Sequence, residues 1–176
     1  MSNLPANLNT QATIWRRLFH AVAGSIIPFM GLMLASSSMI NILILLSLLA
    51  VSLEVLRLSS SRINHNLTNL TKHLLKIDEL RNITGATYMV VASLLVFLLF
   101  DKSIAVMSLF FLSIGDPTAA LVGIKTRKYV VFDKSLIGTV AFILACFIFV
   151  SLLILTGAIS FHWGLIVGAI VAGTVE

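Results

Sequence analysis

Six long apolar runs, separated by more polar segments, constrain this chain more than any other feature of its sequence. Each run is long enough to cross a hydrocarbon core of ~30 Å if modest tilt and snorkelling ends are allowed. Because a bilayer offers the backbone no hydrogen-bond partners, such runs are expected to fold as helices. The candidate spans cover residues 18–36, 39–56, 83–100, 103–123, 136–156 and 161–175.

Composition agrees with this interpretation, because 59% of the 176 residues are hydrophobic and only 11% are charged. Those values lie far from the range of a soluble globular domain. We therefore predict an all-α fold, a polytopic transmembrane helical bundle forming a single integral membrane domain over residues 1–176. Residues 1–17 form a polar tail, and the first span is expected to be retained rather than cleaved as a signal. The single cysteine, Cys146, excludes a disulfide framework and a cysteine-based metal site.

The basic residues fall on one side of the expected membrane. With six spans, the positive-inside rule places the N-terminus and both long connections in the cytoplasm. Only Lys102 falls on the other side; the remaining basic residues are Arg16, Arg17, Arg57, Arg62, Lys72, Lys76, Arg81, Lys125, Arg127, Lys128 and Lys134. The net charge of +5 is thus explained by topology and by anionic lipid head groups. There is no basic stripe with interleaved aromatics, so a nucleic-acid partner is not expected.

Two cytoplasmic connections have a distinct character. Residues 57–82 carry apolar side chains at helical spacing, which predicts an amphipathic helix lying in the membrane interface. This segment could be a topological strap, or it could border a cavity that faces the cytoplasm. Residues 124–135 form a basic cytoplasmic loop.

The tripeptide Gly115-Asp116-Pro117 interrupts the fourth apolar run. A carboxylate deep in a bilayer costs at least ~2.5–3.5 kcal/mol on insertion scales, so it normally faces the interior and marks a site. Pro117 removes a backbone donor and disfavours helical geometry at Asp116, which predicts a break or kink there, with Gly115 adding freedom. Asp116 could hold Mg²⁺, which takes one or two carboxylates and fills its other positions with water and phosphate oxygens. The alternative is a kinked helix in which Asp116 is a cap or pairs with a lysine.

The basic loop follows this acid directly, so a candidate metal ligand precedes a cluster suited to phosphates. Neither a Walker loop nor a dinucleotide fingerprint is present.

Several segments, in order, resemble the membrane-embedded CTP-dependent lipid kinases, a family that includes dolichol kinase, phytol kinase and the CTP-using diacylglycerol kinase. This family is related more distantly to the CDP-diacylglycerol synthases. IGDPTAALVG (114–123) followed by DKSLIGT (133–139) is similar to the central signature of the family. The supporting segments are WRRLFHAVAG (15–24), LEVLRL (53–58) and ELRNITGATYMV (79–90). Family members often have an acid where this chain has Ile137, and they usually continue beyond the position of Glu176.

The resemblance implies transfer of the γ-phosphoryl group of CTP to the hydroxyl of a lipid alcohol at the cytoplasmic face, with positioning and charge neutralisation dominating catalysis. The acceptor would be a polyprenol or dolichol, a phytol-like isoprenoid, or diacylglycerol. Asp116 would bind Mg²⁺. Glu54 or Glu79 would hold a second metal or accept the substrate proton, and the sequence does not choose between them. The residues expected to bind the nucleotide phosphates are Lys125, Arg127, Lys128, Lys134, Ser135, Gly138 and Arg57.

Glu54 and Arg57 are three residues apart, so they share a helix face and could equally be a self-compensating pair at the membrane boundary. Two other functions remain open: a cytidylyltransferase acting on phosphatidate, and a non-catalytic membrane protein or small transporter in which the interrupted helix binds an ion or substrate. The expected location is a bacterial or archaeal cell membrane, or the endoplasmic reticulum or a plastid membrane in a eukaryote, with the site facing the cytoplasm. The oligomeric state is left open.

Overall fold

The computed structural model describes the backbone of residues 6–60, 64, 82–125, 130–131, 134–159 and 161–175. Side chains are described for these residues except 6–17, 20, 124–125, 130–131, 134–135 and 175. Most of the predicted interfacial helix and part of the basic loop lie outside the described residues. The chain divides into two compact units, 1–33 with 101–176 (unit 1) and 34–100 (unit 2).

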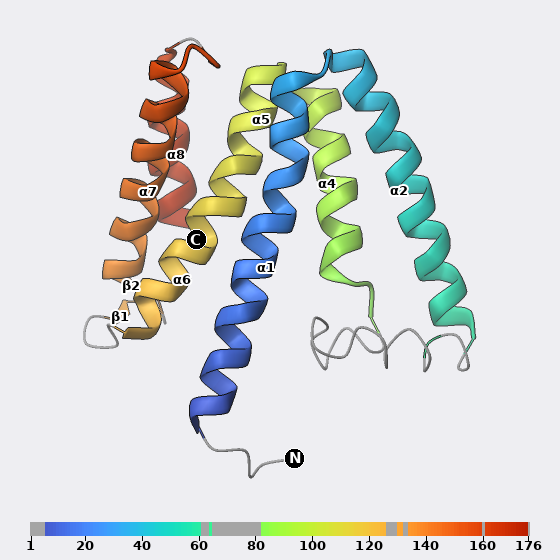
Figure 1. The fold of residues 1–176 in the computed structure, drawn as a ribbon, viewed down its shortest axis with the longest axis horizontal. Helices are drawn as coiled ribbons and strands as arrows, with labels where there is room; N and C mark the ends of the chain where they lie inside the picture. The colour runs from blue at the N-terminus through green and yellow to red at the C-terminus, as the bar shows by residue number, and fades with distance from the viewer. Residues whose placement is uncertain are drawn as a thin grey trace. The chain divides into compact units, whose positions relative to one another are not determined.

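All six predicted apolar segments coincide with helices (Figure 1). Three of the helical segments are long and apolar enough to cross a membrane: Ser36–Ser59, Lys102–Gly123 and Leu136–Leu155. The other apolar helices, Ala21–Met33, Gly85–Leu99 and Trp163–Thr174, are shorter. The all-helical class is thus confirmed for the described chain, apart from two strands of two residues each, and the number of crossings stays a prediction. The assignment of 1–176 to one integral membrane domain also stays a prediction.

Unit 2 contains α2 (Ser36–Ser59) and α4 (Gly85–Leu99), which pack against each other. The end of α2 lies beside the start of α4, because Glu54 accepts the backbone N–H of Thr84 at 3.0 Å. Met39 and Leu43 of α2 and Phe97 of α4 are buried. Large apolar side chains elsewhere on both helices are exposed, as on helices that face lipid.

Unit 1 is built around one long helical segment made of α5 (Lys102–Phe110), the π-helix η2 (Phe111–Gly115) and α6 (Asp116–Lys125). In the most apolar stretch of Lys102–Gly123, 56% of the residues are buried, against 22% and 28% in the other two candidate spans. It is therefore the core helix of this unit. Around it pack α1 (Ala6–Met33), α7 (Leu136–Leu155) and α8 (Trp163–Val175).

An aromatic cluster fixes the centre of unit 1. Phe110 is fully buried, and its ring lies 5.0 Å from that of Phe29 on α1 and 4.6 Å from that of Phe149 on α7. Such edge-to-face and tilted pairs contribute about 0.5–1.5 kcal/mol beyond the area they bury. The three rings thus pack α1, α5 and α7 against one another at the height of Phe110.

Polar contacts set the direction of α1 against this core helix. Lys102 Nζ donates to the Leu32 carbonyl at 3.3 Å, and Ser25 Oγ donates to Ser113 Oγ at 3.2 Å. Rising numbers on one helix thus pair with falling numbers on the other, so the two run antiparallel. The start of α1, which includes Arg16 and Arg17, therefore lies at the same end of the unit as the end of α6 (Figure 1). The end of α6 leads into a short antiparallel pairing of β1 (Val130–Val131) with β2 (Lys134–Ser135).

Candidate functional site

The interruption at Gly115-Asp116-Pro117 takes a form that the sequence did not predict. Asp116 has φ −56° and ψ −51°, so it is helical, and the chain stays helical from Lys102 to Lys125. The predicted departure of Asp116 from helical geometry is therefore wrong. The irregularity is instead the wider turn of η2, which ends immediately before Asp116.

Proline chemistry explains this position. The ring of a proline inside an α-helix clashes with the carbonyl four residues earlier and cannot donate to it. Here Pro117 is the second residue of α6 and directly follows the π-helical turn inside a continuous helix. The π-helical turn before it provides the change of register, and Thr118 Oγ1 donates to the Ile114 carbonyl at 2.6 Å. A hydroxyl thus satisfies a backbone acceptor inside the irregular turn.

Gly115 serves close packing rather than the backbone freedom predicted for it. Gly115 is buried, and a Cβ atom added to it would lie 2.7 Å from Phe142 Cδ2 on α7. That separation is shorter than real contacts allow, so only glycine lets α7 approach the π-helical turn this closely. Asp116 follows directly, and its position is fixed by this contact.

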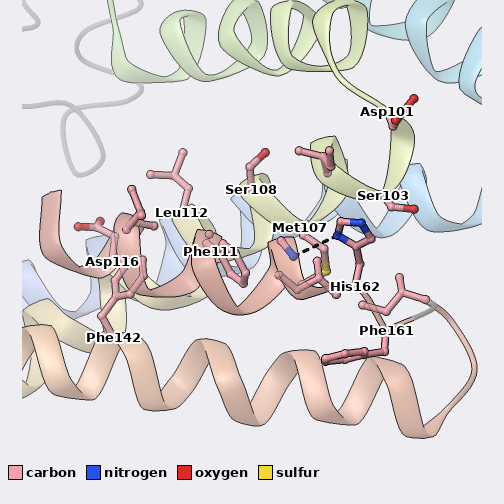
Figure 2. A pocket seen from close by; sticks show the side chains of 17 residues that line it. Asp101, Ser103, Met107, Ser108, Phe111, Leu112, Asp116, Phe142, Phe161 and His162 are labelled. Atoms are coloured by element: carbon pink, nitrogen blue, oxygen red, sulfur yellow. Dashed lines mark hydrogen bonds between the residues drawn. The ribbon is translucent and has the colours of Figure 1, made fainter.

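The Asp116 side chain is exposed and lines a cavity of about 1040 Å³ in unit 1 (Figure 2). No hydrogen bond or ion pair of its carboxylate is found among the described side chains, so neither predicted alternative role, a cap or a lysine partner, is seen there. A carboxylate in this state can accept a cation or a hydrogen-bond donor from a ligand.

The cavity is apolar along most of its length. Its lining includes Phe111 and Leu112 of η2 and Leu165 and Val171 of α8. Polar groups gather away from Asp116, where the lining includes Asp101, Ser103 and His162 (Figure 2). No lysine or arginine is among the described side chains that line it.

His162 has its orientation fixed by the start of α8. The backbone N–H of Gly164 donates to His162 Nδ1 at 3.0 Å, so the imidazole caps the first turn of that helix. In this arrangement Nδ1 is an acceptor, and a neutral ring carries its proton on Nε2. Sequence reasoning did not select Asp101, Ser103 or His162. The one signal was the spacing of Gly164, Gly168 and Ala172, which places small residues every four positions on one face of α8.

Most of the predicted phosphate-binding side chains are outside what the structure describes. The backbone places Lys125 at the end of α6 and Lys134 and Ser135 in β2. Arg127 and Lys128 lie outside the described residues, as does Glu79. Gly138 is buried in the first turn of α7. The roles given to these residues stay predictions.

Glu54 and Arg57 form a buried ion pair in unit 2, as their spacing on one helix face predicts. Both side chains also hold the connection that follows α2. Glu54 accepts the Thr84 N–H at 3.0 Å and the Thr84 hydroxyl at 3.4 Å. Arg57 donates to the Asn82 carbonyl at 2.6 Å and to Asn64 Oδ1 at 3.0 Å. The pair therefore fixes the entry into α4 at Thr84.

The described side chains offer a Mg²⁺ ion one carboxylate ligand in the cavity of unit 1 that the proposed site uses, that of Asp116, and no complete set of protein ligands. Within the described ranges no group of three metal-ligating side chains occurs. Asp116 offers one exposed carboxylate, which agrees with the habit of Mg²⁺ of binding few protein ligands and completing its shell with water and phosphate oxygens. An all-protein cage is not formed by the described side chains.

Comparison with known proteins gives one relative without an assigned activity. The chain is 26% identical over 142 residues to the uncharacterized protein RP860 of Rickettsia prowazekii. The alignment covers 79% of this chain and 69% of that protein. No protein-family model matches the chain, and no solved structure matches it.

Proposed function

We propose that this protein transfers the γ-phosphoryl group of CTP to the hydroxyl of a membrane lipid alcohol, with the reaction at the cytoplasmic face of a six-span bundle. The observation that carries the proposal is the exposed carboxylate of Asp116, which has no partner among the described side chains, at a largely apolar cavity in a helix of membrane-spanning length. A reaction between a triphosphate and a lipid needs a polar group for the phosphates beside an apolar cavity for the lipid chain. The ordered resemblance to CTP-dependent lipid kinases supplies the nucleotide and the reaction.

In this mechanism Asp116 would hold Mg²⁺, and the ion would supply neutralisation of the triphosphate charge of CTP. Lys125 lies nine residues further along α6, about 13 Å away by helical rise, toward the end that carries the basic loop. The lysine and arginine side chains of 124–135 bind the phosphates as charge-assisted donors. Binding and orientation then bring the lipid hydroxyl to the γ-phosphorus.

The acceptor proton needs a base, and Glu54 or Glu79 remains the proposed group. Glu54 is buried in an ion pair with Arg57. If Glu54 is the base, its carboxylate would accept the proton of the lipid hydroxyl while still paired with Arg57. Arg57 keeps its proposed role in phosphate binding. Neither role is required for the proposal about Asp116.

The transporter alternative is weakened by the geometry of the interrupted helix. Transporter sites of that kind are formed where a helix unwinds and exposes its backbone. Residues 102–125 remain helical throughout, with a widened turn rather than an extended break. A helix with this geometry presents side chains, chiefly Asp116, rather than bare carbonyls.

One experiment separates the three functions. Purified protein in vesicles is given CTP labelled in either the α- or the γ-phosphate, with a polyprenol, a phytol-like alcohol or diacylglycerol. The proposal predicts γ-label in the lipid fraction and release of CDP. Lipid carrying α-label with release of pyrophosphate would instead establish a cytidylyltransferase. Absence of both labels from every lipid would remove the enzyme proposal.

A further inference from the structure

We propose that the cavity of unit 1 is a groove for a single extended hydrocarbon chain, whose hydroxyl end lies at Asp116 and whose tail runs along η2 and α5 toward His162. This inference rests on the proposed function for the identity of the polar end. It adds a binding site for the lipid chain and a limit on its length.

The groove can be followed through three levels (Figure 2). At one end Asp116 lies near Phe142, whose ring also contacts the position of Gly173. In the middle, Phe111 lies opposite Gly168, where an added Cβ would be 3.5 Å from the Phe111 ring. At the far end are Ser103 and His162. The thirteen steps from Ser103 to Asp116 correspond to about 20 Å of helix.

The distribution of polarity defines the occupant. Between its ends the groove is walled mainly by Ile, Leu, Met, Phe and Val side chains, and the hydroxyl of Ser108 there donates to the Ala105 carbonyl at 2.9 Å. A ligand with polar groups along its length would therefore leave most of them without partners. A ligand that is polar at one end and hydrocarbon along the rest pairs its hydroxyl with Asp116 and meets mostly apolar surface beyond it. The volume of about 1040 Å³ lies just above the ~300–1,000 Å³ typical of ligand pockets, so the space suffices for a long chain.

Small residues on α8 keep the groove open. Gly164, Gly168 and Ala172 lie on the face of α8 that lines the cavity, whereas Gly173 lies against Ile143 of α7. The Cβ atom at Gly168 meets no close contact, so helix packing does not require glycine there. The absence of a side chain at Gly168 instead makes the groove wider at this position.

The far end acts as a stop. Here Asp101, Ser103 and His162 replace the apolar wall, and His162 is held by the Gly164 N–H. Hydrocarbon that reaches this level would cover polar groups without pairing them, which is unfavourable. Binding is therefore expected to strengthen with chain length up to about 20 Å of chain and to gain nothing beyond it.

The test uses a primary alcohol with one long hydrocarbon chain and a photoreactive diazirine at the tail end, in vesicles without nucleotide. In the wild-type protein we expect labelling at Met107 and Leu165, displaced by an excess of the unlabelled alcohol. A diazirine placed beside the hydroxyl is expected to label residues around Asp116 and Phe142 instead. Labelling spread over exposed residues such as Leu144 and Ile148, with no displacement, would overturn the proposal.

A matched pair of variants then tests the width of the groove. Gly168→Leu fills its middle, and Val167→Leu places a leucine at the neighbouring exposed position outside the lining. Overfilling predicts that Gly168→Leu lowers tail-end labelling by the long probe about tenfold while labelling by a short-chain probe is kept. Val167→Leu should change neither. Equal labelling of all three proteins by the long probe would contradict the groove.

The two proposals fail separately. Because labelling needs no nucleotide, a groove that labels as described in a protein that never transfers phosphate would stand while the kinase proposal falls. Phosphoryl transfer from CTP with random labelling would sustain the kinase and remove the groove. If Gly168→Leu does not fold, Gly168→Ala and the displacement measurement on the wild-type protein decide the matter.

Discussion

Gly115 lies directly against the ring of Phe142, so closely that a Cβ atom at this glycine would be 2.7 Å from Phe142 Cδ2. The contact joins the π-helical turn to α7 beside Asp116, so it controls where the carboxylate lies. Gly115→Ala is expected to destabilise the protein by about 1–3 kcal/mol, the usual cost of overpacking. Thermal unfolding in detergent measures the change.

Gly168→Ala is the control for this substitution, because its Cβ would be 3.5 Å from Phe111 Cε2, an ordinary contact. Replacing a helical glycine by alanine at such a position should leave stability unchanged or raise it by about 0.5–1 kcal/mol. Equal loss of stability in both variants would show that the Phe142 contact is not the cause.

The buried Glu54–Arg57 pair predicts a large penalty for removing one partner. Glu54→Leu leaves the Arg57 guanidinium buried without its carboxylate and removes the acceptor of the Thr84 N–H. Breaking a buried pair in this way costs about 3–5 kcal/mol. Chemical unfolding of the variant measures it, with Ser52→Ala as control, since the exposed Ser52 hydroxyl donates to the Leu48 carbonyl of its own helix.

A double variant shows whether that loss of stability comes from an unpaired buried charge or from the loss of each side chain separately. Glu54→Leu combined with Arg57→Met should be much less damaging than the sum of the two single changes, because no buried charge is left unpaired. Additive losses would mean that the two side chains act independently.

Pro117 provides a test of the π-helical turn. Pro117→Ala restores an N–H that can donate to a carbonyl of the preceding turn, so the widened register is no longer required. We expect equal or higher thermal stability together with lower phosphoryl transfer, because Asp116 would rotate away from its place on the groove. Unchanged transfer in a more stable protein would separate the π-helical turn from function.

Six crossings predict opposite accessibility for the two ends of unit 1. In a Cys146→Ala background, Ser103→Cys should react with an impermeant maleimide from outside intact cells, and Leu136→Cys only after the membrane is opened. Both positions are exposed, so reactivity reports the side of the membrane. Reaction of both from the same side would contradict the assignment.

The helices could be predicted from sequence because hydropathy and length determine them. All six apolar runs became helices, and the predicted limits 136–156 differ by a single residue from the observed Leu136–Leu155. The face shared by Glu54 and Arg57 also followed from their spacing. These are local properties, governed by rise and period along one helix.

The shape of the interrupted helix could not be predicted in the same way. Proline at 117 indicates an irregularity, but the choice between an extended break and a π-helical turn depends on what packs against the turn. That partner is Phe142, which is 25 or more residues away in sequence from the tripeptide. The cavity likewise depends on tertiary packing, since its polar far end joins Asp101 and Ser103 at the start of the core helix to His162 before α8.

The account depends most on Asp116, and one comparison tests it directly. Transfer of γ-label from CTP to a long-chain lipid alcohol is measured for wild type, Asp116→Asn and Asp101→Asn, two isosteric changes at exposed acids of the same cavity. We expect Asp116→Asn to lower the rate about 100-fold or more, as loss of a principal electrostatic group does, and Asp101→Asn to stay within a few-fold of wild type. Equal rates for wild type and Asp116→Asn would contradict the account.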